Sequence, residues 1–132
     1  MTNYELEGGV SHYDDCIVDP SMGYKAFAAG DAKLCVIDVP ENIGNGTLLI
    51  LKDSFANGLI PFLVEHYEKI IMFDPRYSSL SLYNYMKYVK VEPVVYDDIL
   101  IATHYFETNF TKWPDQLKNA LGEPEDIKNI VK

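Results

Sequence analysis

Ser54 is the residue of this sequence that is best placed for chemistry. It stands in Lys52-Asp53-Ser54, directly after the apolar run 47–52 and before an amphipathic segment. At a helix start, free backbone N–H groups can hold an oxyanion, and a serine beside a general base can act as a nucleophile. The alternative is that Ser54 or Asp53 is only the N-cap of that helix, and the pattern taken alone favours the cap.

Further polar residues follow other apolar runs or stand early in the next helix. His104 follows one run and suits either a general base or a surface loop histidine. Arg76 suits either a clamp on a substrate carboxylate or an ion pair with Asp74 or Asp53. Asn57 suits either an oxyanion donor or a residue that satisfies a turn. We therefore take Ser54 and His104 as candidate catalytic residues, and Asn57, Asp74 and Arg76 as candidate substrate-binding residues.

The histidines and cysteines do not indicate a metal site. His12 has Asp14 and Asp15 nearby, but their spacing does not suit a metal ion. Cys16 and Cys35 form no metal motif, and whether they pair in a disulfide depends on the compartment. We expect neither a metal nor a cofactor.

Composition and charge restrict the partners. The chain has 132 residues, 48% of them hydrophobic, and a formal net charge of −9. This is enough for one domain with a substantial core. The negative charge speaks against nucleic acid and anionic membranes as partners. No apolar stretch approaches the roughly 18 residues of a membrane span, so we expect no membrane insertion.

Hydrophobic periodicity predicts the elements that position these residues. Short apolar runs bounded by turn residues predict strands at 33–39, 47–52, 70–74 and 98–103. Helical spacing predicts helices within 56–69, 80–89 and 113–121, the second capped by Ser78 or Ser79, and a short helix within 21–30. The first two strands are expected to pair as a hairpin or a looped strand pair.

The alternation of strands and helices after residue 47 predicts βαβ units with right-handed crossovers. We expect an α/β fold with three layers: a mainly parallel, incomplete sheet with flanking helices and an N-terminal hairpin or irregular segment. The whole chain is expected to form a single domain, with an irregular segment at 1–32, a core at 33–121 and a C-terminal tail at 122–132. Because ligands bind at the carboxyl ends of parallel strands, the candidate residues should share one rim of the sheet.

The stretch 48–77 closely resembles the C-terminal region of the DHHW (Asp-His-His-Trp) family, a branch of the SGNH-hydrolase-like superfamily. The resemblance covers about residues 24–110. Its motifs here are Lys52-Asp53-Ser54-Phe55-Ala56-Asn57, Pro61-Phe62-Leu63 and Asp74-Pro75-Arg76-Tyr77.

This resemblance implies an SGNH- or flavodoxin-like fold in which Ser54 is the nucleophile of an esterase or O-acetyltransferase acting on glycans. The chain departs from the family in having no Asp-His or His-Trp dipeptide and no Asp-x-x-His. We therefore expect the C-terminal portion of such an enzyme, inactive or poorly active alone. The alternative is a non-catalytic binding or assembly module on the same scaffold.

The resemblance also bears on partners and location. It implies a glycan or an acyl ester as ligand, with a second copy or an upstream domain completing the sheet. The first ten residues lack the basic and apolar regions of a signal peptide, which favours the cytoplasm. The family resemblance favours a bacterial extracytoplasmic location, so the location stays open.

Overall fold

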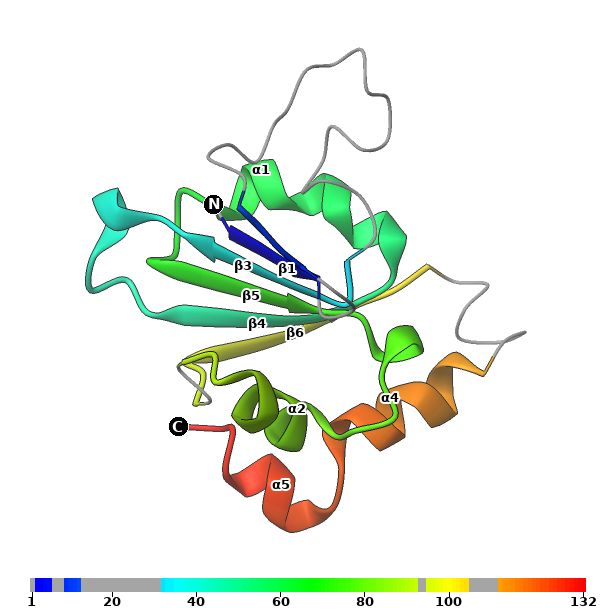
Figure 1. The fold of residues 1–132 in the computed structure, drawn as a ribbon. Coiled ribbons are helices and arrows are strands. Elements are labelled where there is room, and N and C mark those ends of the chain that lie inside the picture. Colours follow the sequence, from blue (N-terminus) through cyan, green and yellow to red (C-terminus); the bar gives the residue numbers. More distant parts are fainter. Residues whose placement is uncertain (1, 6–8, 13–31, 93–94, 105–111) are drawn as a thin grey trace.

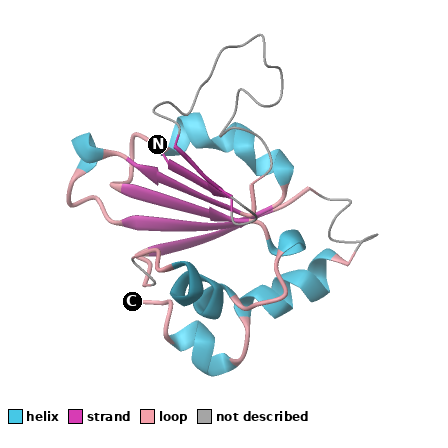
Figure 2. Ribbon diagram, viewed as in Figure 1, coloured by secondary structure: helices cyan, strands magenta, loops and turns pink. Residues whose placement is uncertain are grey.

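The computed structural model describes residues 2–5, 9–12, 32–92, 95–104 and 112–132, with only the backbone described for the first two ranges. The described residues form an α/β fold with helices on both faces of a six-stranded mixed sheet (Figure 1, Figure 2). The strand order is β2-β1-β3-β5-β4-β6. The strands are β1 (Thr2–Glu5), β2 (Gly9–His12), β3 (Leu34–Asp38), β4 (Thr47–Lys52), β5 (Lys69–Phe73) and β6 (Asp98–Ala102).

The strands β5, β4 and β6 form a parallel half of the sheet. Leu49 of β4 lies opposite Ile71 of β5 on one side and opposite Ile99 of β6 on the other. Both Leu49 and Ile71 are fully buried, as expected for a strand covered on both faces. The prediction of three parallel strands in this part of the chain is confirmed, with each boundary within one residue of the predicted one.

The other half of the sheet is antiparallel, and here the prediction from sequence is wrong. β3 does not pair with β4, because β5 lies between them and runs antiparallel to β3. The pairs β1–β2 and β1–β3 are antiparallel as well. The sheet is therefore mixed rather than mainly parallel. Of the two alternatives for the N-terminal segment, the antiparallel pair β1–β2 agrees with the hairpin, and the assignment of 1–32 as irregular is wrong for 2–5 and 9–12. An apolar run shows that a strand is buried, but it does not identify the neighbouring strand.

Alternate residues of β4 contribute to two apolar cores, one on each face of the sheet. Leu49 and Leu51 belong to the core that includes Leu82 of α2 and Ala120 of α4. The intervening residues of β4 belong to the other core, which includes Ile60 of α1. The helical segments are η3 (Ser54–Leu59), α1 (Ile60–Leu63), α2 (Leu82–Val89), α4 (Trp113–Leu121) and α5 (Pro124–Lys128), with one-turn segments η2 (Pro40–Asn42) and η4 (Pro75–Tyr77).

Two of the predicted helices differ from the observed ones at their ends. The helix predicted within 56–69 ends at Leu63, because the side-chain amide of Asn42 donates to the carbonyls of Val64 (2.8 Å) and Tyr67 (3.2 Å). These bonds satisfy carbonyl groups that a longer helix would have used. The second helix is capped by Ser81, and not by the two serines predicted, while α4 spans its predicted range. The helix predicted within 21–30 and Cys16 lie outside the described residues.

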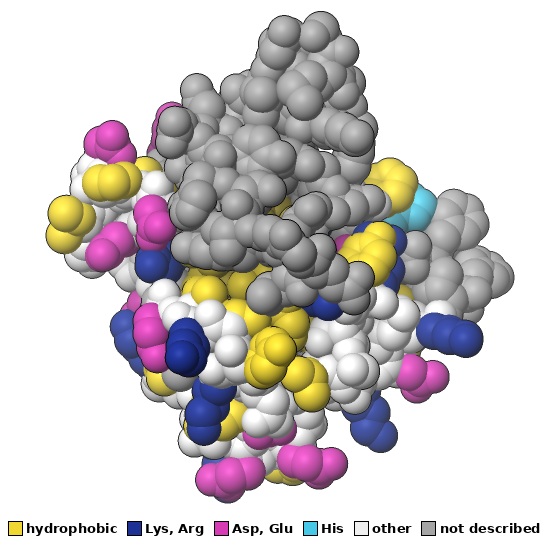
Figure 3. All heavy atoms as spheres, in the orientation of Figure 1, with side chains coloured by type: hydrophobic (Ala, Val, Ile, Leu, Met, Phe, Trp, Pro, Cys, Tyr) yellow, Lys and Arg dark blue, Asp and Glu magenta, His cyan; other side chains and the backbone are white. Residues whose placement is uncertain are grey.

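The face of the molecule in Figure 3 carries acidic and basic side chains intermingled over its lower part. Within the described ranges, no helix is both long and apolar enough to span a membrane.

The core tyrosine of α2, Tyr85, gives a prediction for alkaline pH. Its ring packs against Phe73 with centroids 5.3 Å apart, and its buried hydroxyl has no hydrogen-bond partner among the described residues. Burial, with a smaller contribution from Tyr88, raises the pKa of Tyr85 from 10.0 to about 12. The pKa of Tyr85 is higher in the folded state than in the unfolded state. The free energy of unfolding is therefore unaffected by this tyrosine below pH 10.0, and it falls as the pH rises from 10.0 toward 12.

Tyr85→Phe removes this ionisation and leaves no buried group unpaired. We expect its free energy of unfolding at neutral pH to stay within about 0.5 kcal/mol of wild type. Its loss of stability above pH 10.0 should be smaller than that of wild type, as measured by urea unfolding across this range. Equal losses in the two proteins would contradict the assignment to Tyr85.

Candidate functional site

Three polar loops leave the sheet at the same end. β5, β4 and β6 are parallel, with Leu51 opposite both Phe73 and Ile101, so their carboxyl ends share one rim. The loop after β4 contains Asp53 and Ser54, the loop after β5 contains Asp74 and Arg76, and Thr103 and His104 follow β6. The structure therefore places Ser54 and His104 at the same end of the sheet, as the strand-end rule predicts.

Asp53 connects two of these loops. Its carboxylate is fully buried and caps η3 by accepting a hydrogen bond from the backbone N–H of Phe55 (2.9 Å). The same carboxylate accepts bonds from the Thr103 hydroxyl (2.7 Å) and the His104 backbone N–H (2.6 Å). Hydrogen bonds to a carboxylate are stronger than neutral ones. Asp53 thus fixes the Ser54 turn against the loop that carries His104.

Ser54 is the first residue of η3, and Asp53 is the N-cap. Of the two residues considered for the cap, the structure selects Asp53 and leaves the position of Ser54 compatible with a nucleophile. The N–H of Phe55, the next residue, donates to Asp53 and is not available to an oxyanion. Any oxyanion at Ser54 would need other donors.

The ring of Phe55 stacks on the ring of His104. Their centroids are 4.3 Å apart, and the rings are inclined by 23°. A contact of this kind contributes about 0.5–1.5 kcal/mol beyond the burial of area. Together with the bond from its backbone to Asp53, the stack holds His104 beside the turn that begins with Ser54.

Asp74 and Arg76 form an ion pair within the third loop. Asp74 is fully buried and accepts bonds from the Arg76 backbone N–H (3.0 Å), Nε (3.0 Å) and Nη2 (2.7 Å). The Arg76 side chain is 21% exposed, and its guanidinium lies 5.4 Å from the centre of the Tyr77 ring. This is the ion pair considered from the sequence, and of its two side chains only that of Arg76 is partly exposed.

Asn57 lies in η3 and is fully buried. The structure therefore separates the candidate substrate-binding residues into one accessible group, Arg76, and two buried ones, Asn57 and Asp74. Their roles toward a substrate stay predictions.

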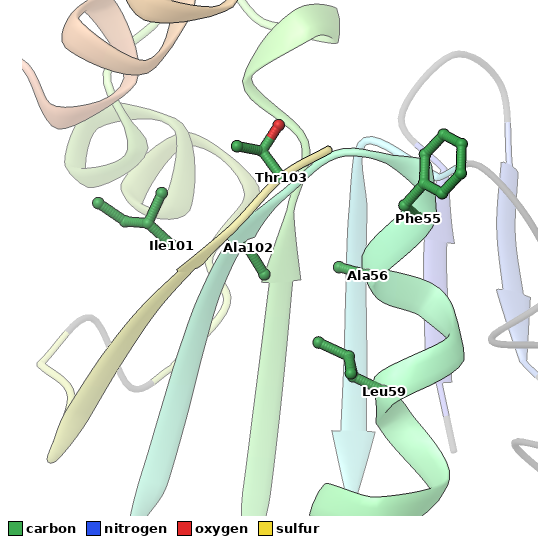
Figure 4. A pocket seen from close by; sticks show the side chains of 6 residues that line it. All are labelled: Phe55, Ala56, Leu59, Ile101, Ala102 and Thr103. Atoms are coloured by element: carbon green, nitrogen blue, oxygen red, sulfur yellow. The ribbon is translucent and has the colours of Figure 1, made fainter. Parts of the chain in front are cut away.

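A shallow apolar pocket of about 270 Å³ lies next to the Ser54 turn (Figure 4). Helix η3 contributes one wall and the end of β6 the other. The lining residues are Phe55, Ala56, Leu59, Ile101, Ala102 and Thr103. In Figure 4, Ala56 and Leu59 point from the helix toward the sheet, and Thr103 stands at the strand end.

Comparison with known proteins identifies the family. The family described as DHHW protein matches residues 2–73, which is more than half of the chain. The chain belongs to the DHHW family. Among curated proteins, none matches the sequence.

Solved structures show the same fold in longer proteins. A DHHW family protein from Eubacterium siraeum shares 26% identity with a TM-score of 0.60, over 99% of this chain and 41% of that one. Bacillus cereus PatB1 shares 22% identity with a TM-score of 0.61, over 89% of this chain and 38% of that one. A structure of PatB1 with a sulfonyl adduct shares 22% identity with a TM-score of 0.58, over 80% of this chain and 36% of that one. The chain thus spans about two fifths of the length of these proteins.

Two residues of this DHHW site were not singled out from the sequence. Thr103 donates to Asp53, and Phe55 stacks on His104. The position of Thr103 directly after an apolar run could have indicated a residue of the rim. Its bond to Asp53 could not be expected, because the two residues are 50 positions apart in the sequence. Within the part of the chain that is described, no three histidine, cysteine, aspartate or glutamate side chains gather as they would around a metal ion.

Proposed function

We propose that residues 1–132 form one domain of a DHHW protein and make up the C-terminal portion of an SGNH-like serine esterase or O-acyltransferase. The proposed fold is the three-layer, flavodoxin-like arrangement of that superfamily, and the proposed substrates are acyl esters of glycans. The observation that supports this most directly is the Asp53 carboxylate, which holds the Ser54 turn and the His104 loop together at one end of parallel strands.

In this proposal the Ser54 hydroxyl attacks the acyl carbonyl carbon while the His104 imidazole accepts its proton. The tetrahedral intermediate collapses, the alkoxide of the ester leaves with that proton, and an acyl group remains on Ser54. A water molecule or a glycan hydroxyl then attacks the acyl-enzyme, releasing the acid or the new ester and restoring the serine. Arg76 is the accessible cation for the substrate, and the buried Asn57 and Asp74 support the rim.

The sequence carries no Asp-His motif to orient a base, so we expect weak activity from the chain alone. A general base supplies about 10²–10⁴-fold in rate, and a serine hydroxyl is a poor nucleophile without one. Turnover of 4-nitrophenyl acetate should therefore stay close to the background rate. Ser54→Ala should abolish any excess over background, while Ser79→Ala, which changes an exposed serine, should leave it unchanged.

Labelling tests the nucleophile even where turnover is too slow to measure. PatB1 has been seen with a sulfonyl adduct, and sulfonyl electrophiles react with activated nucleophiles. We expect phenylmethylsulfonyl fluoride to modify Ser54, as identified by mass spectrometry of peptides, and to leave Ser79 unmodified. Hydrolysis or labelling that persists in Ser54→Ala would refute the assignment. Strong hydrolysis lost in both Ser54→Ala and His104→Ala would show that the chain is a complete enzyme.

The second candidate function is a binding or assembly module without catalysis. The exposed apolar residues beside the rim favour it, since Phe55 is 67% exposed and Ile101 is 48% exposed. Absence of both labelling and turnover in a folded chain would favour this candidate.

A further inference from the structure

β6 forms one edge of the sheet and has β4 as its one neighbour among the described strands. Ile99 and Ile101 lie on the same face of β6 and are 36% and 48% exposed. An edge strand with β-branched apolar residues and an exposed row of backbone groups pairs readily with another strand. Such an edge is normally covered or charged in a monomeric protein.

An apolar stripe on the neighbouring helix extends this edge. Phe55, Leu59 and Phe62 belong to the continuous helical segment η3–α1, and the first two line the same pocket beside β6. They are 67%, 44% and 74% exposed. The pocket in Figure 4 joins the two features, since Phe55 and Leu59 line it together with Ile101 and Ala102 of β6. A strand added beside β6 would therefore meet apolar side chains on both of its faces.

We propose that this edge pairs with β6 of a second copy of the chain, the two strands running antiparallel about a two-fold axis at Leu100. The strand that fits must be apolar on both faces, and β6 itself meets this requirement, with the sequence Asp-Ile-Leu-Ile-Ala. A two-fold axis makes the interface self-complementary. The axis is perpendicular to the sheet, so the η3–α1 stripes of both copies lie on the same face and meet across the junction.

The distribution of charge supports this register. Centred on Leu100, the pairing places Ile99 opposite Ile101 of the second copy, and Asp98 opposite Ala102. Asp97 lies outside β6, and the backbone of the preceding Tyr96 is already paired with Val131, so the new pairing ends at Asp98. No carboxylate of the strand therefore faces another carboxylate, which would be unfavourable in a directly opposed pair. Each copy has a net charge of −9, so the two copies repel at long range, and added salt should strengthen the pairing.

The molar mass in solution tests the proposal. Light scattering after size-exclusion chromatography should give twice the 15.0 kDa chain mass for the wild-type protein, with the dimer fraction rising with salt. Ile101→Lys should give a monomer, because it places an ammonium group in the apolar junction. Ile43→Lys makes the same change at a residue that is 78% exposed in the loop after η2, and it should remain a dimer.

A second variant tests the register by the formation of a new bond, and does not depend on loss of the dimer. Leu100→Cys places two thiols at the two-fold axis, and mild oxidation should join the copies by a disulfide much faster than in Ile43→Cys or wild type. A wild-type monomer at submillimolar concentration would overturn the proposal. So would a dimer that survives Ile101→Lys and forms no Leu100→Cys disulfide, because its interface would lie elsewhere.

Discussion

Replacing Asp53 by alanine should lower the free energy of unfolding by about 3–5 kcal/mol, since each buried group left without its partner costs roughly 1–3 kcal/mol. The groups affected are the N–H of Phe55, the N–H of His104 and the hydroxyl of Thr103, all of which donate to the buried carboxylate. Urea unfolding followed by circular dichroism measures the change.

Asp53→Asn should give an intermediate loss, because the amide keeps one acceptor oxygen but turns an NH₂ group toward a donor. Glu65→Ala removes an exposed carboxylate and should stay within about 0.5 kcal/mol of wild type. An Asp53→Ala variant as stable as Glu65→Ala would mean that the three bonds do not hold the loops together.

The second large effect is expected at Asp74. Asp74→Ala removes a fully buried carboxylate that accepts hydrogen bonds from three donor groups of Arg76, and leaves a partly buried guanidinium without its partner. We expect a loss of about 2–4 kcal/mol, somewhat less than for a completely buried ion pair because the Arg76 side chain is partly exposed.

A double-mutant cycle with Arg76→Ala isolates the pair itself. The coupling free energy should exceed about 1 kcal/mol, because the two side chains are in direct contact. A coupling near zero would show that Asp74 acts only through its bond to the Arg76 backbone, as the N-cap of η4.

The sequence predicts the parallel half of this fold well, because its strands are short apolar runs between clear turn residues. β4 was predicted at its observed bounds, and α4 likewise, since Pro114 and Gly122 mark its two ends. The antiparallel half was not predictable in the same way. β3 and β5 are both continuous apolar runs, and neither run indicates that β5 separates β3 from β4.

The candidate site, like the fold, could be predicted from the sequence only in part. The strand-end rule places Ser54 and His104 on one rim from the sequence alone. It could not show that the Asp53 carboxylate reaches Thr103, because this contact depends on the lateral position of β6 beside β4. It also could not show that Asn57 and Asp74 are buried, since polar residues early in a loop or helix are usually exposed.

The central place of β5 has a consequence for how the chain acquires its structure during synthesis. β3 and β4 are synthesised before β5. Until residues 69–73 follow, β3 has only β1 beside it, and β4 has neither of its final neighbours. Leu34 of β3 pairs with Phe73, and Leu48 of β4 pairs with Ile70, so neither pair can form before β5 has been synthesised. Two apolar segments are thus exposed to the cell in the interval, which is when aggregation competes with folding. A released chain that ends before residue 69 should therefore depend on chaperones far more than a released chain that ends after residue 73.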